Sequence, residues 1–296
     1  MKIFLTFLCC FILHKSFSQT LFLDKVTKVS KKTRTYKKLD SIKLKLDFYK
    51  PRKMKSKTPL ILYVHGGGFS GGERDDIYIE SFANNMAERG YAVASISYQL
   101  TMKKLGFGCN TKSKDKIDAF NTASNDISNA INYLIKYKEK FNFNPEQIIL
   151  MGTSAGAEAV LNLAYVYDSK ILSKEFKFAG VISMAGAIIT LDKINTRTAI
   201  PTQLFHGTDD KLVPYNIAAH HYCDKNSVGY LKLYGSKAIA NKLKEIDKPF
   251  YLFTIKKGNH SWSGRPMNQC RKEIVDFLYY DVLKNNSTNR QTEITI

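Results

Sequence analysis

The sequence predicts a single α/β domain in which a mostly parallel sheet is covered by helices on both faces. Two observations lead to this expectation. Short apolar runs alternate along the chain with segments of helical periodicity, which is the pattern of repeated strand–helix–strand units. A length of 296 residues with 44% hydrophobic content is also enough for one large core.

The elements follow one another in a regular order, and the first is an alternating segment. Ile42–Phe48 reads as a half-buried edge strand with its lysines outward. The apolar runs that we expect to form the remaining strands of a sheet of the eight-stranded type are Leu60–Val64, Tyr91–Tyr98, Gln147–Met151, Ala179–Met184, Thr202–His206 and Phe250–Ile255. The expected helices are Tyr78–Arg89, Lys116–Lys140, the alanine-rich segment after Ser154, Ser236–Glu245 and Arg271–Leu283.

Two glycine-rich strings close apolar runs and point to chemistry. Gly152–Gly156 reads GTSAG and lies between an expected strand and an expected helix, which is the setting of a G-x-S-x-G turn that presents a serine nucleophile. The flanking glycines remove Cβ atoms that would collide across so sharp a turn. His65–Phe69 reads HGGGF and offers backbone N–H groups to a tetrahedral oxyanion.

Acidic and imidazole side chains follow the later strands. Asp209 and Asp210 come after Thr202–His206, and His260 comes after Phe250–Ile255. The carboxyl ends of parallel strands meet at one edge of a sheet, so we expect Ser154, an aspartate and His260 to lie together. The chain order is serine, aspartate, histidine.

With these motifs in this order, the chain resembles α/β-hydrolases of the carboxylesterase and lipase type, especially bacterial esterases with an HGGGF or HGGGW loop. The resemblance covers nearly all of the chain after residue 18. It implies an acyl-enzyme mechanism with Ser154 as nucleophile and His260 as base. The family pattern H-G-x-x-D-x-x-V-P selects Asp210 as the residue that orients His260, and a one-residue shift of the loop would select Asp209.

The same resemblance implies an oxyanion hole and assigns supporting roles. Its donors would be the backbone N–H groups of Gly67, Gly68 and Ala155. His65 is expected to hold the HGGGF loop by hydrogen bonds and His206 to pack its own loop. Tyr98 and Glu158 lie near the site, where we expect Glu158, one helical turn beyond Ser154, to pack or face solvent.

The termini and the cysteines bear on the cellular compartment of the protein. Residues 1–18 read as a signal peptide that ends before Gln19, residues 19–284 as the catalytic domain and residues 285–296 as a polar, frayed tail. We therefore expect a secreted or periplasmic protein without a stable membrane anchor. Cys109, Cys223 and Cys270 permit at most one disulfide in the mature chain, and their spacing fits no zinc site. No metal or cofactor is expected.

Charge and loop composition leave the partner open. The net charge is +19, and residues 24–57 are strongly basic. Such a segment can bind a polyanion or form a solvated face; the general excess of lysine favours the solvated face, and we expect no nucleic-acid partner. The expected substrate is a small-molecule or polysaccharide ester with a short acyl or aryl group, including acetyl or feruloyl groups. The alternatives are a peptidase of the prolyl-oligopeptidase type, for whose propeller domain the chain has no room, and a non-catalytic binding protein on a hydrolase scaffold.

Overall fold

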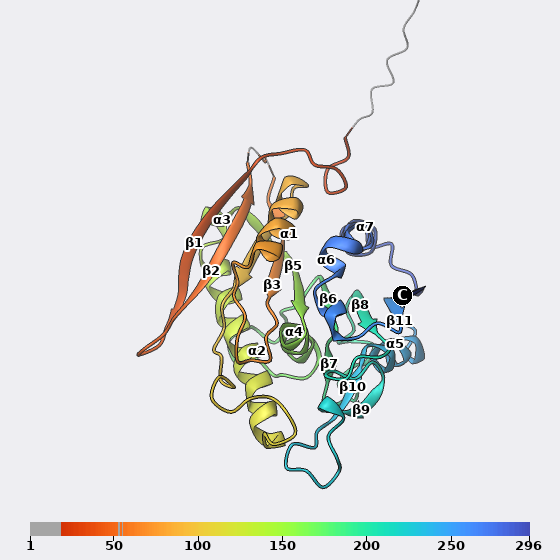
Figure 1. The fold of residues 1–296 in the computed structure, drawn as a ribbon. Coiled ribbons are helices and arrows are strands. Elements are labelled where there is room, and N and C mark those ends of the chain that lie inside the picture. Colours follow the sequence, from red (N-terminus) through yellow and green to blue (C-terminus); the bar gives the residue numbers. More distant parts are fainter. Residues whose placement is uncertain (1–18, 53, 55) are drawn as a thin grey trace, which may run out of the picture.

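The computed structural model describes residues 19–52, 54 and 56–296, and the sheet that crosses it is large and mostly parallel. Within that part of the chain the sheet has nine strands (Figure 1). In spatial order they are β1 (Val29–Lys38), β2 (Lys43–Pro51), β4 (Ala92–Ile96), β3 (Thr58–Val64), β5 (Phe143–Thr153), β6 (Gly180–Met184), β8 (Thr202–Gly207), β11 (Phe250–Lys256) and β12 (Arg290–Thr295). The first two pairings are antiparallel, and all strands from β4 to β12 are parallel.

Helices cover both faces of this sheet, which confirms the predicted fold class. Those of eight or more residues are α1 (Ile77–Glu88), α2 (Ser113–Lys136), α4 (Ala155–Tyr165) and α5 (Ser236–Glu245). The short ones are α3 (Lys138–Phe141), α6 (Pro266–Gln269) and α7 (Arg271–Asp276), and α7 continues into the π-helical turn η3 (Phe277–Leu283). The expected helix over residues 116–140 is therefore two helices, and the expected closing helix changes its winding near Phe277.

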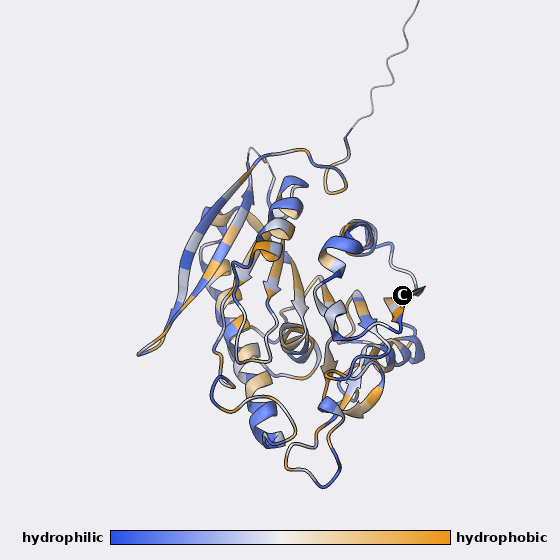
Figure 2. Ribbon diagram, viewed as in Figure 1, coloured by the Kyte–Doolittle hydropathy of each residue, from blue (hydrophilic) through white to orange (hydrophobic). Residues whose placement is uncertain are grey.

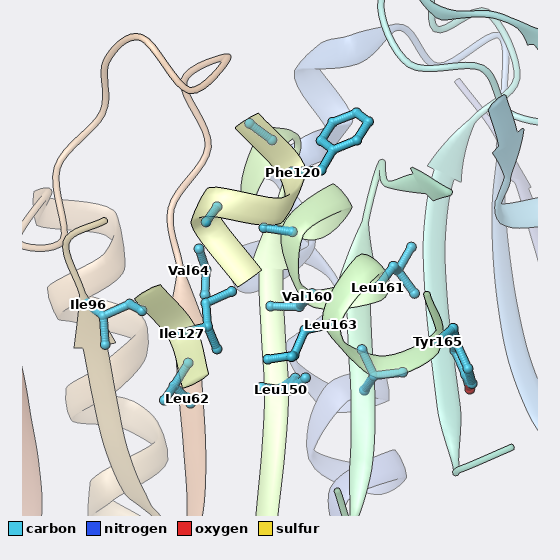
Figure 3. Close-up of a cluster of buried hydrophobic side chains, with 14 of the residues drawn as sticks. Leu62, Val64, Ile96, Phe120, Ile127, Leu150, Val160, Leu161, Leu163 and Tyr165 are labelled. Carbon is cyan, nitrogen blue, oxygen red and sulfur yellow. The ribbon is translucent and has the colours of Figure 1, made fainter. Parts of the chain in front are cut away.

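The sheet separates two apolar cores because neighbouring strand residues point to opposite faces. One face carries α2, α4 and α5, and Figure 3 shows Phe120 and Ile127 of α2 with Val160 of α4 above strand residues such as Leu62 and Leu150. The other face carries α1, α6 and α7 against alternate residues such as Ile61 and Met151. Each such fully buried aliphatic side chain contributes about 2 kcal/mol, so the central strands are held firmly from both sides.

The structure corrects the prediction of an edge strand in the basic N-terminal segment. Residues 42–48 do not form an edge strand, because β1 pairs with β2 on its outer side. On β2, Lys43 and Lys45 point to solvent as expected, whereas Asp47 and Tyr49 are buried. Figure 2 shows this alternation as blue and orange bands at the left of the sheet. The physical reason is that residues 29–38, of which Val29, Ser30 and Arg34–Lys37 are partly buried, pair with β2 and add one more ladder.

The opposite edge corrects another expectation. Residues 290–295, which were expected to fray, form β12 and pair in parallel with β11 from Tyr251 to Lys256. The chain therefore ends beside β11 (Figure 1). Arg290 of β12 also pairs with the nearly buried Asp281. Backbone pairing and this ion pair order a segment whose side chains are mostly polar.

A second, three-stranded sheet lies beyond the carboxyl end of the large one. It consists of β7 (Ala187–Ile188), β10 (Lys232–Gly235) and β9 (Ile217–Ala219). The 3₁₀ turn η1 (His220–Tyr222) follows β9 directly, and η2 (His260–Ser263) follows β11. None of the helices in the described residues is long and apolar enough to cross a bilayer. The expected signal peptide, residues 1–18, lies outside the described residues.

Candidate active site

Ser154 lies on a sharp turn between β5 and α4. Its backbone has φ 49° and ψ −122°, a region that a non-glycine residue rarely adopts. The turn is held by hydrogen bonds from Ser154 N–H to the carbonyl of Met184 at 2.9 Å and from Glu158 N–H to the carbonyl of Ser154 at 2.9 Å. A Cβ on Gly152 would lie 2.3 Å from the carbonyl oxygen of Gly156, and a Cβ on Gly156 would lie 2.1 Å from that of Val64. Glycine is therefore required on both sides of the serine.

Parallel pairing brings His260 and Asp210 to the same edge of the sheet. β8 and β11 pair in register, so the loops that follow them start side by side. Asp210 lies in the first loop, and His260 begins η2 after the second. His260 Nε2 is 2.8 Å from Ser154 Oγ, and His260 Nδ1 is 2.7 Å from Asp210 Oδ2. The three side chains form one continuous hydrogen-bonded series.

The carboxylate of Asp210 is fully buried and has a partner at each oxygen. Oδ1 accepts hydrogen bonds from the backbone N–H groups of Leu212 at 2.9 Å and Val213 at 3.0 Å. Oδ2 faces His260 and also lies 3.4 Å from Nε2 of His206. Burial alone would raise the pKa of Asp210, but the hydrogen bonds from His206 and His260 prevail and hold that pKa far below its ordinary value. The group is ionised at neutral pH.

The structure distinguishes the two aspartates that the sequence left open. Asp209 is exposed, and its Oδ1 accepts from the hydroxyl of Thr208 at 2.9 Å. Asp210 is the one that contacts His260. His206 packs the loop, since Nδ1 bonds Ser236 Oγ at 2.9 Å and Nε2 lies 3.1 Å from the carbonyl of Val213.

The HGGGF loop passes directly beside the serine. A Cβ on Gly66 would lie 3.2 Å from the Cβ of Ser154. Gly67 and Gly68 have positive φ values of 112° and 59°, and among the described residues neither backbone N–H donates to a protein acceptor. Ala155, the first residue of α4, presents its N–H at the start of that helix. These groups are free to bind an anion near Ser154 Oγ.

His65 and Tyr98 hold the loop from behind. His65 Nδ1 hydrogen bonds with the carbonyl of Gly66 at 2.8 Å, and the hydroxyl of Tyr98 donates to the carbonyl of His65 at 3.0 Å. The two rings stack with centroids 4.5 Å apart. Burial lowers the pKa of His65, so this imidazole is neutral at pH 7. Neither ring contacts Ser154 through a hydrogen bond.

A cavity of about 690 Å³ opens above Ser154 and His260. Its walls come from both faces of the sheet. The wall from the α1 and α6 side contains Asp76, Tyr78, Ile79, Arg265, Met267 and Asn268. The wall from the α2 and α4 side contains Phe107, Glu158, Leu212, Val213, His220 and His221.

Sequence reasoning missed part of that second wall. Glu158, which was expected to pack or face solvent, is buried at 1% exposure and borders the cavity, and so does His220 at 1%, which sequence reasoning did not place there. Glu158 Oε1 lies 3.6 Å from His220 Nε2. The position of Glu158 four residues after Ser154 was a usable signal. His220 had none, because the strand that it follows, β9 (Ile217–Ala219), is too short to be recognised from the sequence.

A disulfide joins the two loops that form this wall. Cys109 and Cys223 are bonded with their Cα atoms 5.3 Å apart, and Cys270 is a buried free thiol. The bond connects the loop that carries Phe107 to the segment just after His220 and His221. In the described part of the chain, no group of three or more histidine, cysteine or acidic side chains could hold a metal ion.

Curated relatives of the chain are named as esterases. A segment of 130 residues is 32% identical to gut esterase 1 of Caenorhabditis elegans, covering 43% of this chain and 22% of the relative. Another of 122 residues is 29% identical to esterase B1 of Culex pipiens, covering 41% and 21%. The matched segment thus spans only about a fifth of the length of these curated relatives.

Solved structures support the fold over most of the chain. Esterase 2 of Thermogutta terrifontis, solved after phosphorylation by paraoxon, superposes with a TM-score of 0.61 at 18% identity, covering 88% of this chain and 96% of that one. The propionate-bound form of the same enzyme gives the same TM-score and coverage. The model of the family described as BD-FAE matches residues 46–195, which is half of the sequence and includes both glycine-rich motifs. The chain belongs to the BD-FAE family and has the α/β-hydrolase fold.

Proposed function

We propose that this protein is a serine hydrolase that cleaves carboxylic ester bonds through an acyl-enzyme intermediate. The observation that carries the proposal is the hydrogen-bonded series from Asp210 through His260 to Ser154, which stands at the mouth of a cavity. Ser154 would be the nucleophile, and neutral His260 would accept its proton. Ionised Asp210 would keep the proton on Nδ1 of His260 and stabilise the imidazolium that forms.

The reaction proceeds in two steps, acylation of Ser154 and hydrolysis of the acyl-enzyme. Ser154 Oγ attacks the ester carbonyl carbon, and its proton passes to His260 Nε2. As the tetrahedral intermediate collapses, the bond to the alcohol oxygen breaks and His260 returns the proton to that oxygen. Water then attacks the acyl-enzyme in the same way, giving the carboxylic acid and free Ser154. The N–H groups of Gly67, Gly68 and Ala155 would bind the oxyanion in both steps.

For the substrate, we propose short-chain acyl or aryl esters, with acetyl and feruloyl groups on polysaccharide as the polymeric candidates. A cavity of about 690 Å³ has room for a small acyl group and part of an alcohol. Support also comes from the Thermogutta terrifontis enzyme, which was solved with propionate and with butyrate. The basic strands β1 and β2 would suit an anionic polymer surface.

We also propose that the protein is exported after removal of residues 1–18. The charged start and apolar run of that segment support this, and so does the Cys109–Cys223 disulfide, because such bonds persist mainly in oxidising compartments. The first residue of the mature protein should then be Gln19, which N-terminal sequencing of the secreted form would detect. A secreted chain that still begins at Met1 would contradict this.

The central test of the reaction is Ser154→Ala. We expect its turnover of p-nitrophenyl butyrate to fall by about 10⁴-fold or more, because only binding and the oxyanion donors remain. Ser173→Ala is the matched control, since Ser173 is exposed and lies outside the cavity. Equal thermal unfolding of both variants shows that the fold is intact. Undiminished turnover by Ser154→Ala would remove the proposal.

The oxyanion role is tested at Gly67. A Cβ there would lie 2.3 Å from the carbonyl oxygen of Gly71, and the positive φ is itself unfavourable, so Gly67→Ala should displace the loop. Loss of one oxyanion donor typically lowers kcat by about 10²–10³-fold. Gly71→Ala is the control, because a Cβ at Gly71 meets nothing within 4 Å. Similar rates for the two variants would argue against this role of the loop.

A further inference from the structure

Glu158 and His220 form a second carboxyl–imidazole pair in the same cavity, and the proposed mechanism does not use it. Glu158 comes from α4, one helical turn after Ser154, and His220 from η1 beyond β9. Both side chains are 1% exposed and border the cavity. Their nearest polar atoms, Glu158 Oε1 and His220 Nε2, are 3.6 Å apart, which is too long for a hydrogen bond.

Neither side chain has a hydrogen-bond partner among the described residues. Glu158 Oε1 and His220 Nδ1 are both buried without one. A buried polar group left unpaired is destabilising, and nearly all such groups in folded proteins are paired. Because both residues border the cavity and Glu158 Oε1 lies 3.6 Å from His220 Nε2, a molecule that enters this cavity can supply a partner to both side chains.

The surroundings of the pair select an uncharged partner. Burial, reinforced by the charge of Asp210, raises the pKa of Glu158 well above its ordinary value, and only Lys116 opposes this. Burial and the neighbouring His221, Lys116 and His260 lower the pKa of His220. Burial thus disfavours the charged form of both groups, so the pair favours an uncharged partner.

Neighbouring groups shape the subsite and exclude other partners. Lys116 Nζ donates to the carbonyl of Gly229 at 2.9 Å, so its charge is already engaged, and that charge disfavours a cationic ligand. The Phe107 ring meets the His220 ring edge-on with centroids 4.8 Å apart and gives the wall an apolar part. A neutral carboxyl and a neutral imidazole each offer one donor and one acceptor. A hydroxyl group, which donates and accepts at once, matches them.

We propose that Glu158 and His220 form a subsite that binds a hydroxyl group of the ester substrate. The inference rests on the proposed esterase function and narrows its substrates to hydroxylated esters. The hydroxyl belongs either to the acyl part or to the alcohol part. In both cases it donates to one member of the pair and accepts from the other, which gives each side chain a hydrogen-bond partner.

The test compares esters that differ by one hydroxyl. For the acyl part these are p-nitrophenyl butyrate and p-nitrophenyl 3-hydroxybutyrate, and for the alcohol part ethyl butyrate and 2-hydroxyethyl butyrate, followed by titration of the acid released. We expect kcat/KM of the wild-type protein to favour the hydroxylated ester at least about tenfold in one of the two pairs, mainly through KM. Ratios near one in both pairs, with good turnover, would overturn the subsite but not the esterase proposal.

Variants separate recognition from a structural role. The double variant Glu158→Leu/His220→Leu removes both unpaired groups, so the hydroxyl preference should vanish, whereas thermal unfolding should occur at the wild-type temperature or above. A merely structural pair predicts lower thermal stability and an unchanged preference, which would refute the inference. Glu158→Gln, which keeps shape and hydrogen-bonding groups, should retain part of the preference. Glu146→Gln, at an exposed position outside the cavity, is the control for both readouts.

Discussion

Two carboxyl–imidazole pairs share one cavity, and they differ in almost every physical respect. Asp210 accepts two backbone hydrogen bonds and a third from His260, whereas Glu158 accepts none through its side chain among the described residues. His260 is 22% exposed and touches Ser154 Oγ, whereas His220 is buried and touches no reacting group. Hydrogen bonds thus keep the carboxyl group of Asp210 ionised, whereas burial disfavours the charge of Glu158.

The difference shows that hydrogen bonding, more than burial, decides the charge of these carboxyl groups. Both are almost fully buried, and burial disfavours the ionised form of both. Asp210 follows the end of β8, where the turn at Leu212 and Val213 directs its N–H groups at the carboxylate. Glu158 lies in the first turn of α4, and among the described residues no backbone N–H donates to its Oε1. Environments that separate two pKa values in this way also separate two roles.

The largest expected effect concerns the pair formed by Asp210 and His260. Asp210→Asn removes the charge that orients His260, and we expect kcat/KM for p-nitrophenyl butyrate to fall by about 10³–10⁴-fold. Asp209→Asn is the matched control, because Asp209 is exposed and does not contact His260. Comparable losses in the two variants would mean that the loop, and not this pair, supports activity.

An intermediate effect is expected at the disulfide that holds the loop of His220, which forms the second pair with Glu158. Removing the Cys109–Cys223 bond with a Cys109→Ser/Cys223→Ser variant should lower the free energy of unfolding by about 2–4 kcal/mol, because the bond closes a long loop in the unfolded chain. Urea unfolding measures this, and a reductant should destabilise the wild type but not the variant. The hydroxyl preference should fall more than the hydrolysis of p-nitrophenyl butyrate, since the bond holds the loop of His220. Equal unfolding curves with and without reductant would show that the bond stabilises nothing.

The smallest expected effect is the pH dependence of stability at Glu158. Its pKa is raised in the folded state, so the folded protein retains a proton that the unfolded chain loses above about pH 4.5, and the free energy of unfolding falls as pH rises. Glu158→Gln cannot ionise and escapes this loss. The variant should equal the wild type near pH 4 and become the more stable of the two as pH rises toward 7, which unfolding experiments over this pH range measure.

For Asp210 the pH dependence of stability has the opposite sign, so this residue serves as the comparison. Its pKa is lowered in the folded state, so the carboxylate stabilises the fold above its ordinary value near 4, and that contribution is lost as pH falls below it. Asp210→Asn should therefore be less stable than the wild type near pH 7, with the gap closing in acid. Parallel pH profiles for Asp210→Asn and Glu158→Gln would contradict the contrast between the pairs.

The fold could be predicted because its elements have strong local signals. The central strand β3 is apolar on both faces, and the predicted helix over residues 236–245 coincides with α5. The edges were harder to predict, because β1 and β12 are rich in polar side chains and are ordered by pairing with a neighbour. Local composition does not reveal such pairing.

The candidate site likewise has one part that the sequence predicts and one part that it does not. Ser154, Asp210 and His260 follow strand ends, so the topology alone brings them to one edge, and the structure has them in contact. His220 approaches Glu158 only through the packing of a long loop, the small sheet and a disulfide. None of these is encoded in a motif. The second pair therefore required the structure.

The most direct test of the account is the site of modification by a fluorophosphonate, which reacts with activated serines. After reaction of the mature protein, peptide mass mapping should place a single adduct on Ser154, and Asp210→Asn should react far more slowly. Such a result would show in one experiment that Ser154 is the reactive serine and that its reactivity depends on Asp210. A peptide containing unmodified Ser154, or an adduct on another residue, would contradict the central claim that Ser154 is the nucleophile.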